Sequence, residues 1–422
     1  MKFFLIYKGD YGTGLKGPEM RYIGLGNALS QKGHEIYIAV NRNTQNSPLN
    51  RLNFIPLNKP LKLLKTIFES DVIVLHGGGP LILLLSIISV FFGKKVILDN
   101  YVPHWIELDE VMNNSKPSIK LLIKSQFNVF RSLLGLFSFD FVIVANQRQQ
   151  DLLRGMIAPF SRTFDFNKIK VIPFGCQPYN PLPKSDGVSL LNSIATTQTP
   201  LTSNEFLIGW LGGTYGWFNL NSVMSALSEA FEKNSQIKLV FFGVSVEQQI
   251  DILSKLPNTV HHQIIFLPWV PFKDRLDYWS AFDLSLVWGG EGYENDYASR
   301  TRNFDCLSLK LPIIQNQDGE WGPRLTQTQT GLVTNIENLA KDVLYLSRHP
   351  EALTQMKKNL ELLAPSFYWD EFANKLLESE KYSRFHPIKG FIHLVALLAI
   401  IPTISIFFFY EILTHLLMIK RT

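Results

Sequence analysis

The chain has 422 residues, of which 46% are hydrophobic and 18% are charged. This composition excludes an intrinsically disordered protein, and the length suits two or three folded domains. The two cysteines, Cys176 and Cys306, stand far apart and have no histidine or cysteine at ligand spacing, which argues against a disulfide framework or a zinc site and favours a reducing cytoplasm.

The net charge of +5 is unevenly distributed. Residues 1–185 carry 22 Lys and Arg against 12 Asp and Glu, whereas the remaining residues carry 19 against 24. A basic half of this kind is typical of docking on an anionic surface, either nucleic acid or the inner leaflet of a membrane.

Short apolar runs typical of buried strands alternate with helical patterns through the first part of the chain. The runs cover residues 2–7, 35–40, 71–76, 95–100, 139–145 and 168–175. Helical stretches between them, such as residues 19–31 closed by Gly33, predict βαβ units and a parallel sheet.

A glycine-rich loop follows the first run and contains Gly9, Gly12, Gly14 and Gly17. It lacks the tight G-x-G-x-x-G spacing of a dinucleotide site, and the second run is followed by Asn41 instead of an acidic residue, so such a site is not favoured. A surface loop without a ligand is the alternative.

Two polar residues end neighbouring strands, His76 after VIVL and Asp99 after VIL. The carboxyl ends of parallel strands meet at the edge where ligands bind, which makes both residues candidates for proton transfer. A hydrogen-bonded turn residue is the ordinary alternative for each, and His104 is a weaker candidate.

Two further segments of this half read as helices. The apolar residues 81–92 are too few to span a membrane and predict a core helix. Residues 119–137 carry an apolar stripe with Lys120, Lys124 and Arg131 beside it. Such a basic amphipathic helix either lies on a membrane surface or packs on its own sheet.

A second series of strand-like runs begins after residue 205 and covers residues 206–213, 237–244, 263–270, 283–290 and 311–316. Residues 181–205, rich in Pro, Ser and Thr, read as a linker in which 188–194 could form a short helix. The predicted fold class is therefore α/β, with two Rossmann-like doubly wound domains over residues 1–182 and 205–385 and a linker over 183–204.

A hydrophobic stretch lies near the C-terminus, where residues 390–410 contain no Asp, Glu, Lys or Arg. About 20 such residues span a bilayer as a helix, so we expect a membrane anchor over residues 390–419. Basic residues flank both ends and leave its orientation open, and a hairpin kinked at Pro402 is the alternative. This stretch favours a membrane over nucleic acid as the anionic surface.

Two motifs of the second domain suit an anionic ligand. The turn GWLGGTYGWFN contains Gly212 and Gly213, and backbone amides beside a helix N-terminus bind anions. Arg300 and Arg302 follow an acidic loop, and a guanidinium fork pairs well with a diphosphate. The alternative is a solvated helix face on which Glu294 or Asp296 pairs with these arginines.

The segment GPEMR at residues 17–21, the turn at 209–219 and the acidic segment 291–315 together resemble bacterial glycosyltransferases of the GT-B architecture, family 4-like, over about residues 1–380. The Arg-Thr-Arg pattern resembles a surface-polysaccharide subgroup. Gly17 and Glu19 would then help to shape the pocket across the cleft from the nucleotide. Gly212 and Gly213 would meet the diphosphate together with Arg300 and Arg302.

The acidic segment departs from the family pattern in one respect. Alignment on Leu311-Pro312 puts Asp305 at the acid that holds the ribose hydroxyls and Lys310 at the usual glycine. The acid that contacts the sugar falls at Tyr297, so Glu294 is its nearest substitute. Trp269 would lie near the base, although a core tryptophan is the simpler interpretation of that residue alone.

The resemblance implies a retaining, metal-independent hexosyltransferase with Asp99, His76 and Glu294 as catalytic candidates and no cofactor. It would move a sugar from a nucleotide-diphosphate sugar to a lipid-linked saccharide in surface polysaccharide assembly, at the cytoplasmic face of the inner membrane, with no nucleic acid as partner. The displaced glutamate, and the absence of an Arg and Lys pair after the 209–219 turn, keep a catalytically silent GT-B-like subunit open as an alternative. A sugar-nucleotide epimerase is another.

Overall fold

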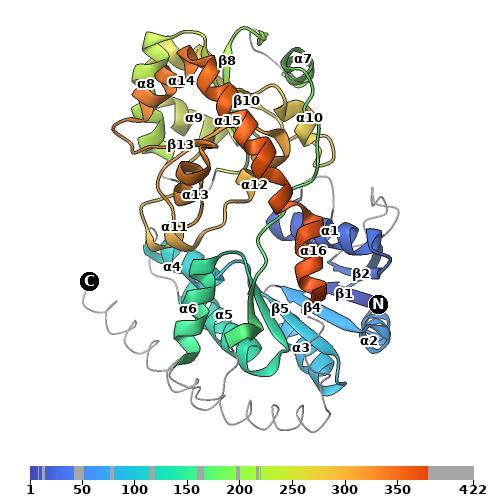
Figure 1. Cartoon of the computed structure of the whole chain (residues 1–422). Coiled ribbons are helices and arrows are strands. Elements are labelled where there is room, and N and C mark those ends of the chain that lie inside the picture. Colours follow the sequence, from blue (N-terminus) through green and yellow to red (C-terminus); the bar gives the residue numbers. More distant parts are fainter. Residues whose placement is uncertain are drawn as a thin grey trace, which may run out of the picture. The chain divides into compact units, whose positions relative to one another are not determined.

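The computed structural model describes residues 1–7, 9–11, 15–41, 52–76, 80–113, 119–158, 166–195, 200–214, 218 and 220–378. The contacts divide the chain into two compact units (Figure 1). Unit 1 comprises Met1–Phe174 and Trp369–Thr422, and unit 2 comprises Gly175–Tyr368. Each unit contains a parallel sheet, which confirms the two Rossmann-like halves expected from the sequence.

The sheet of unit 1 has the strand order β3-β2-β1-β4-β5-β6-β7, and its described pairings are parallel. Its strands are β1 Lys2–Ile6, β2 Glu35–Val40, β3 Asn53–Pro56, β4 Val72–His76, β5 Lys95–Asp99, β6 Phe141–Val144 and β7 Ile169–Val171. Only the short β3 is missing from the predicted runs. The strand order reverses between β1 and β4, which is where open α/β sheets bind ligands at their carboxyl edge.

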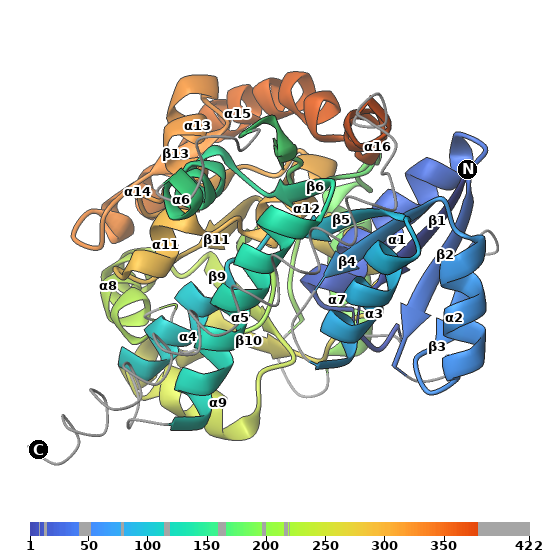
Figure 2. The same ribbon diagram turned by 90° about the horizontal axis from the view of Figure 1, so that it is seen from below.

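The helices of unit 1 are α1 Gly17–Gln31, α2 Pro60–Glu69, α3 Pro80–Phe91, α4 His104–Asn113, α5 Ile119–Ser138, α6 Gln147–Ile157, the short η2 Phe166–Lys168 and α16 Trp369–Glu378. Right-handed crossovers place α2, α3 and α5 on one face of the sheet, where they lie side by side in Figure 2. The predicted helix 19–31 is confirmed, and Gly33 follows it with φ +84°.

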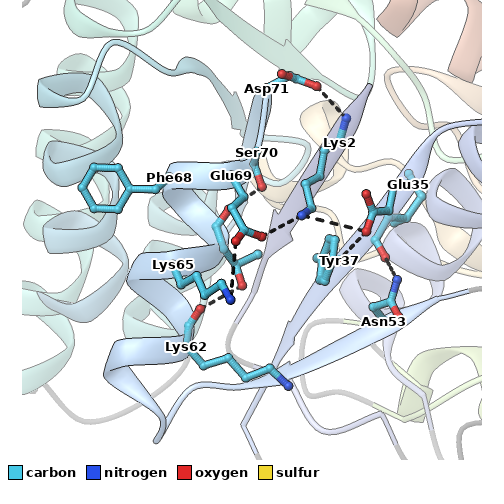
Figure 3. A network of polar contacts seen from close by, with 12 residues as sticks. Lys2, Glu35, Tyr37, Asn53, Lys62, Lys65, Phe68, Glu69, Ser70 and Asp71 are labelled. Carbon is cyan, nitrogen blue, oxygen red and sulfur yellow. Dashed lines mark hydrogen bonds and ion pairs between the residues drawn. The ribbon is translucent and has the colours of Figure 1, made fainter.

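The amino edge of this sheet is held by a network of exposed charges (Figure 3). The backbone N–H of Lys2 donates to Asp71 Oδ2 at 2.8 Å, and its ammonium lies 2.8 Å from Glu69 Oε2 and 3.9 Å from Glu35 Oε1. Exposed ion pairs of this kind contribute little stability each. They tie the start of β1 to β2 and to the end of α2.

The sheet of unit 2 has the order β10-β9-β8-β11-β12-β13. Its strands are β8 Phe206–Trp210, β9 Ile237–Phe242, β10 Ile264–Leu267, β11 Leu284–Val287, β12 Ile313–Gln315 and β13 Gly331–Val333. The first five match the predicted runs, and β13 is a short addition. Trp210, Phe231 and Phe241 are fully buried in the core between this sheet and its helices.

The helical segments of unit 2 are α7 Lys184–Ile194, α8 Leu220–Lys233, α9 Val246–Leu253, η4 Asn258–Gln263, α10 Arg275–Trp279, α11 Tyr293–Tyr297, α12 Thr301–Leu309, α13 Trp321–Thr328, α14 Leu339–Arg348, α15 Pro350–Leu363 and η5 Ala364–Phe367. α7 lies within the segment predicted as a linker. It packs on α10 and on the residues after it, where a Cβ at Gly187 would come within 2.5 Å of Ala281 N. Lys184 Nζ also donates to Asp283 Oδ2 at 2.6 Å, so α7 is part of unit 2.

α16 belongs to unit 1, whereas the second domain was predicted to extend to residue 385. Trp369 begins this helix and its indole lies against α1, where a Cβ at Gly24 would come within 2.2 Å of the ring. No helix among the described residues is long and apolar enough to cross a membrane. The expected anchor over residues 390–419 lies outside the described part of the chain.

Candidate functional site

An arginine of α12 lies against the turn that follows β8. Gly212 has φ +149°, and a Cβ there would lie 3.2 Å from Arg302 Nη2. Arg302 donates from Nη2 to Gly213 O at 3.2 Å and is 7% exposed. Its guanidinium carbon lies 5.0 Å from the ring centroid of Trp210 and 4.7 Å from that of Phe218. These contacts bring Gly212, Gly213 and Arg302 together at the carboxyl edge of the sheet, as the sequence predicts.

Arg300 is paired with the acidic segment that precedes it. It donates to both carboxylate oxygens of Glu294, from Nη1 at 2.9 Å and from Nη2 at 2.7 Å, and from Nη2 to Asn295 Oδ1 at 3.0 Å. All three side chains are buried, and Gly289 is needed beside them because a Cβ there would lie 1.9 Å from Asn295 Oδ1. The pairing of Glu294 with Arg300 matches the alternative interpretation in its partners, but the helix face is not solvated.

Asp305 lies one turn further along α12 and faces α10. Its Oδ1 accepts from Arg275 Nη2 at 2.5 Å, and both side chains are about one-tenth exposed. Arg275 also donates from Nη1 to Phe272 O at 2.8 Å. The helix ends at Lys310 with φ +52°, the left-handed conformation that favours glycine. This explains why the resembled family has glycine at the corresponding position.

Trp269 is not a core residue, because its side chain is 55% exposed. It follows β10 and lies against the turn after β9. A Cβ at Gly243, which has φ +62°, would lie 1.9 Å from Trp269 Nε1. The missing side chain at Gly243 therefore lets the indole rest on the turn at the carboxyl edge of the sheet.

The carboxyl edge of the unit 1 sheet contains a fully buried ion pair. Arg21 Nε donates to Asp99 Oδ2 at 2.8 Å, and neither side chain is exposed. The other two guanidinium nitrogens donate to Pro173 O at 2.7 Å and Ile172 O at 3.0 Å. One arginine thus joins α1, β5 and the segment after β7. Its charge offsets the carboxylate of Asp99, which was predicted to be a proton acceptor.

His76 lies beside this pair because β4 and β5 pair in register at His76 and Asp99. Its Nδ1 lies 2.8 Å from Asp99 O, which places a proton on Nδ1 as the donor. The ring is fully buried and lies 4.8 Å from the ring centroid of Tyr101 and 5.4 Å from that of His104. His104 itself lies 3.2 Å from Glu107 Oε2.

Gly17 begins α1, and Glu19 lies in its first turn. Glu19 is 4% exposed, and a Cβ at Gly9 would come within 2.6 Å of its Oε1. Burial raises the pKa of this carboxyl, against backbone hydrogen bonds that lower it. Burial also raises the pKa of the neighbouring Tyr11 well above its usual range. Gly12 and Gly14 lie outside the described residues.

In the part of the chain that the structure describes, no group of three His, Cys, Asp or Glu side chains lies close enough to hold a metal ion. Three contacts at the carboxyl edges of the two sheets were not predicted from the sequence. Arg21 pairs with Asp99, Arg275 pairs with Asp305, and the rings of Trp210 and Phe218 carry Arg302. Only the acid-to-arginine spacing of Glu294 and Arg300 was visible in the sequence.

The comparisons with known proteins give a consistent fold. No family model matches the chain, and no curated protein matches it by sequence. Among solved structures, Anabaena Alr3699/HepE in complex with UDP-glucose has a TM-score of 0.65 at 15% identity, covering 90% of this chain and all of that one. WaaG, a glycosyltransferase involved in lipopolysaccharide biosynthesis, has a TM-score of 0.63 at 11% identity, covering 89% and 98%.

A sucrose-phosphate synthase from Thermosynechococcus elongatus has a TM-score of 0.59 at 15% identity and covers 90% of this chain and 98% of that one. At such identities the likeness concerns the fold alone, and it extends over nearly the whole length of each structure. The resemblance drawn from the sequence is confirmed at that level: the chain has the GT-B fold of family 4-type glycosyltransferases.

Proposed function

We propose that the protein is a glycosyltransferase that binds a nucleotide-diphosphate sugar at the carboxyl edge of the unit 2 sheet. One observation carries the proposal: Arg302 lies on the Gly212–Gly213 turn, supported by the rings of Trp210 and Phe218. A diphosphate carries negative charge on both phosphates, and Arg302 offers positive charge beside this turn. HepE, which shares the fold, was crystallised with UDP-glucose, so a uridine diphosphate sugar is the first donor to test.

Arg302 is the phosphate ligand in this proposal, and Arg300 supports it indirectly. Because Arg300 is held by both oxygens of Glu294, it stiffens the loop before α12. Glu294 would contact the sugar only if the sugar displaced that pair. Asp305 is proposed to reach the ribose hydroxyls with the carboxylate oxygen that does not accept from Arg275. The exposed indole of Trp269 is proposed to lie beside the base.

Unit 1 is proposed to supply the acceptor side. His76 has a fixed tautomer because Nδ1 donates to Asp99 O, which leaves Nε2 as the ring nitrogen that can accept a proton. Asp99 then acts by positioning His76 and Arg21, and Gly17 and Glu19 shape the start of α1. The acceptor is proposed to be a lipid-linked saccharide used at the cytoplasmic face of a membrane, with residues 390–419 as anchor and with retention of anomeric configuration.

The proposal is tested by titrating UDP into the full-length protein in a calorimeter. Arg302→Met should weaken UDP binding by about tenfold or more, because a charge-assisted hydrogen bond to phosphate is lost. Arg348→Met is the matched control, since it removes the same charge from the exposed last turn of α14 and should leave the affinity unchanged. Equal affinities for wild type and Arg302→Met would contradict the proposed diphosphate site.

A second assay separates transfer from the alternatives. A transferase releases UDP from UDP-sugar only when an acceptor from membranes is added. An epimerase instead converts the nucleotide sugar without an acceptor, and one solved structure of the same fold is a putative UDP-N-acetylglucosamine 2-epimerase from Listeria monocytogenes. Tight UDP binding with neither reaction would indicate a silent binding subunit.

A further inference from the structure

Near the amino edge of the unit 1 sheet lies an exposed cluster of aromatic side chains that the proposed function does not use. Phe68 lies in the last turn of α2, Phe91 is the last residue of α3, and Phe92 follows it; we call these three residues the aromatic patch. The ring centroids of Phe68 and Phe92 are 4.1 Å apart, and those of Phe91 and Phe92 are 5.3 Å apart. Their exposed fractions are 47%, 65% and 42%.

The apolar surface continues along both helices. Leu61 lies seven residues before Phe68, and Leu84 lies seven residues before Phe91, so each pair shares one helix face. Both leucines are exposed, at 83% and 53%. Other positions of the same helices are buried, namely Leu63, Ile67, Ile82 and Leu85. Two neighbouring helices therefore present apolar residues outward as well as inward, which a helix that serves only its own core does not require.

Several lysines lie close in sequence to the aromatic patch. Lys62 and Lys65 are exposed on α2, and Lys94 and Lys95 follow Phe92 and Gly93. Lys94 Nζ donates to Phe68 O at 2.5 Å, which holds the ends of the two helices together. The one nearby acid on α2, Glu69, lies 2.8 Å from Lys2 Nζ and 3.7 Å from Lys65 Nζ, so the described charges around the patch are positive on balance. Figure 3 shows Phe68 pointing away from this charged network.

We propose that the aromatic patch inserts into the interfacial layer of an anionic lipid bilayer. Phenylalanine and leucine between lysines is the composition of surfaces that lie in the headgroup region, where the rings enter the acyl boundary and the ammonium groups meet lipid phosphates. A protein partner would need acidic side chains in place of the phosphates. The basic balance of residues 1–185 agrees with a lipid surface.

The position of the patch leaves the ligand-binding edge accessible. α2 and α3 run antiparallel to the strands, so their last residues lie at the amino edge of the unit 1 sheet, whereas His76 and Asp99 end their strands at the carboxyl edge. Lipid contact at one edge therefore leaves the other edge of unit 1 in water. The proposal does not depend on the donor site in unit 2.

The experiment places a spin label on the full-length protein at Phe91→Cys and, as a matched control, at Leu362→Cys, an 83% exposed position of unit 2. The two native cysteines do not interfere, because both are buried and burial raises the pKa of each thiol to about 12. The accessibility of each label to oxygen and to a soluble nickel chelate is measured with vesicles of equal phosphatidylglycerol and phosphatidylcholine, and with phosphatidylcholine alone.

With the mixed vesicles, the label at residue 91 should gain access to oxygen and lose access to nickel, and the label at residue 362 should change little. Lys62→Glu with Lys65→Glu should reduce the inserted fraction by about tenfold or more, since each basic residue near an anionic surface strengthens binding several-fold. Unchanged accessibility at residue 91, or an equal change at both positions, would overturn the proposal. Spin–spin broadening without vesicles would show that a second copy covers the patch instead.

Discussion

Each unit buries an arginine at the carboxyl edge of its sheet, and the two arginines are held differently. Arg21 of unit 1 gives one nitrogen to Asp99 and the other two to the backbone carbonyls of Ile172 and Pro173. Arg302 of unit 2 lies over the rings of Trp210 and Phe218 and donates to Gly213 O at the turn after β8. An arginine whose nitrogens all bind the protein is part of the architecture, whereas one carried by rings at a glycine turn is suited to a ligand.

This comparison changes the roles that sequence alone suggested. The GPEMR segment resembles a ligand-binding motif, yet its arginine stabilises the unit that contains it. Asp99, expected as a proton acceptor, is the counter-charge of that arginine. Removing Arg21 should therefore mainly lower the stability of the protein. Removing Arg302 should mainly weaken ligand binding.

The largest effect is expected for Arg21→Met. It leaves the carboxylate of Asp99 buried without its partner and two carbonyls without their donors, so the free energy of unfolding should fall by about 3–5 kcal/mol. Urea denaturation of the full-length protein measures the change. Adding Asp99→Leu should recover part of the loss because the uncompensated charge is then removed. Arg302→Met should cost only about 1 kcal/mol, and equal losses for both arginines would remove the distinction between them.

A smaller effect is expected for Asp305→Ala, which tests whether a buried ion pair also serves a ligand. Loss of the pair with Arg275 should lower the free energy of unfolding, and UDP should bind more weakly by about 1–3 kcal/mol if Asp305 also holds the ribose hydroxyls. Calorimetric titration with UDP and thermal unfolding separate the two effects. Weaker folding with unchanged UDP affinity would leave Asp305 a structural residue.

The smallest effect concerns Glu19 and pH. Because burial raises its pKa above the ordinary value of 4.5, the native state binds this proton more tightly than the unfolded chain. Stability from this group is therefore present below pH 4.5 and declines as the pH rises through the raised pKa. Between pH 4.5 and 8, wild type should lose more stability than Glu19→Gln. Asp140 and Asp318, whose pKa values burial also raises, remain in both proteins as a common background.

Much of the fold could be predicted from the sequence because buried parallel strands are continuous apolar runs. The short strands β3 and β13 have no such run and were missed. Some glycines indicate turns at the carboxyl edge of the unit 2 sheet, since Gly212 and Gly243 have positive φ there. Lys310 also has positive φ, at the position where the resembled family has glycine. The pairs of Arg21 with Asp99 and of Arg275 with Asp305 join residues 78 and 30 positions apart. Such pairs depend on how elements pack, so no local pattern indicates them.

The contact of Trp369 with Gly24 has a practical consequence for dissecting the protein. Unit 1 is built from both ends of the chain, since Trp369 begins α16 and its indole packs on α1 at Gly24, where no side chain is in the way. Expressing residues 1–182 alone would expose the surface of α1 around Gly24 to water. Because unit 1 contains both ends of the chain, no single truncation yields it intact. To obtain unit 1 by itself, Gly175–Tyr368 has to be removed as one segment and the two flanking parts joined by a linker. To exchange unit 2, another domain has to be inserted at the same two points.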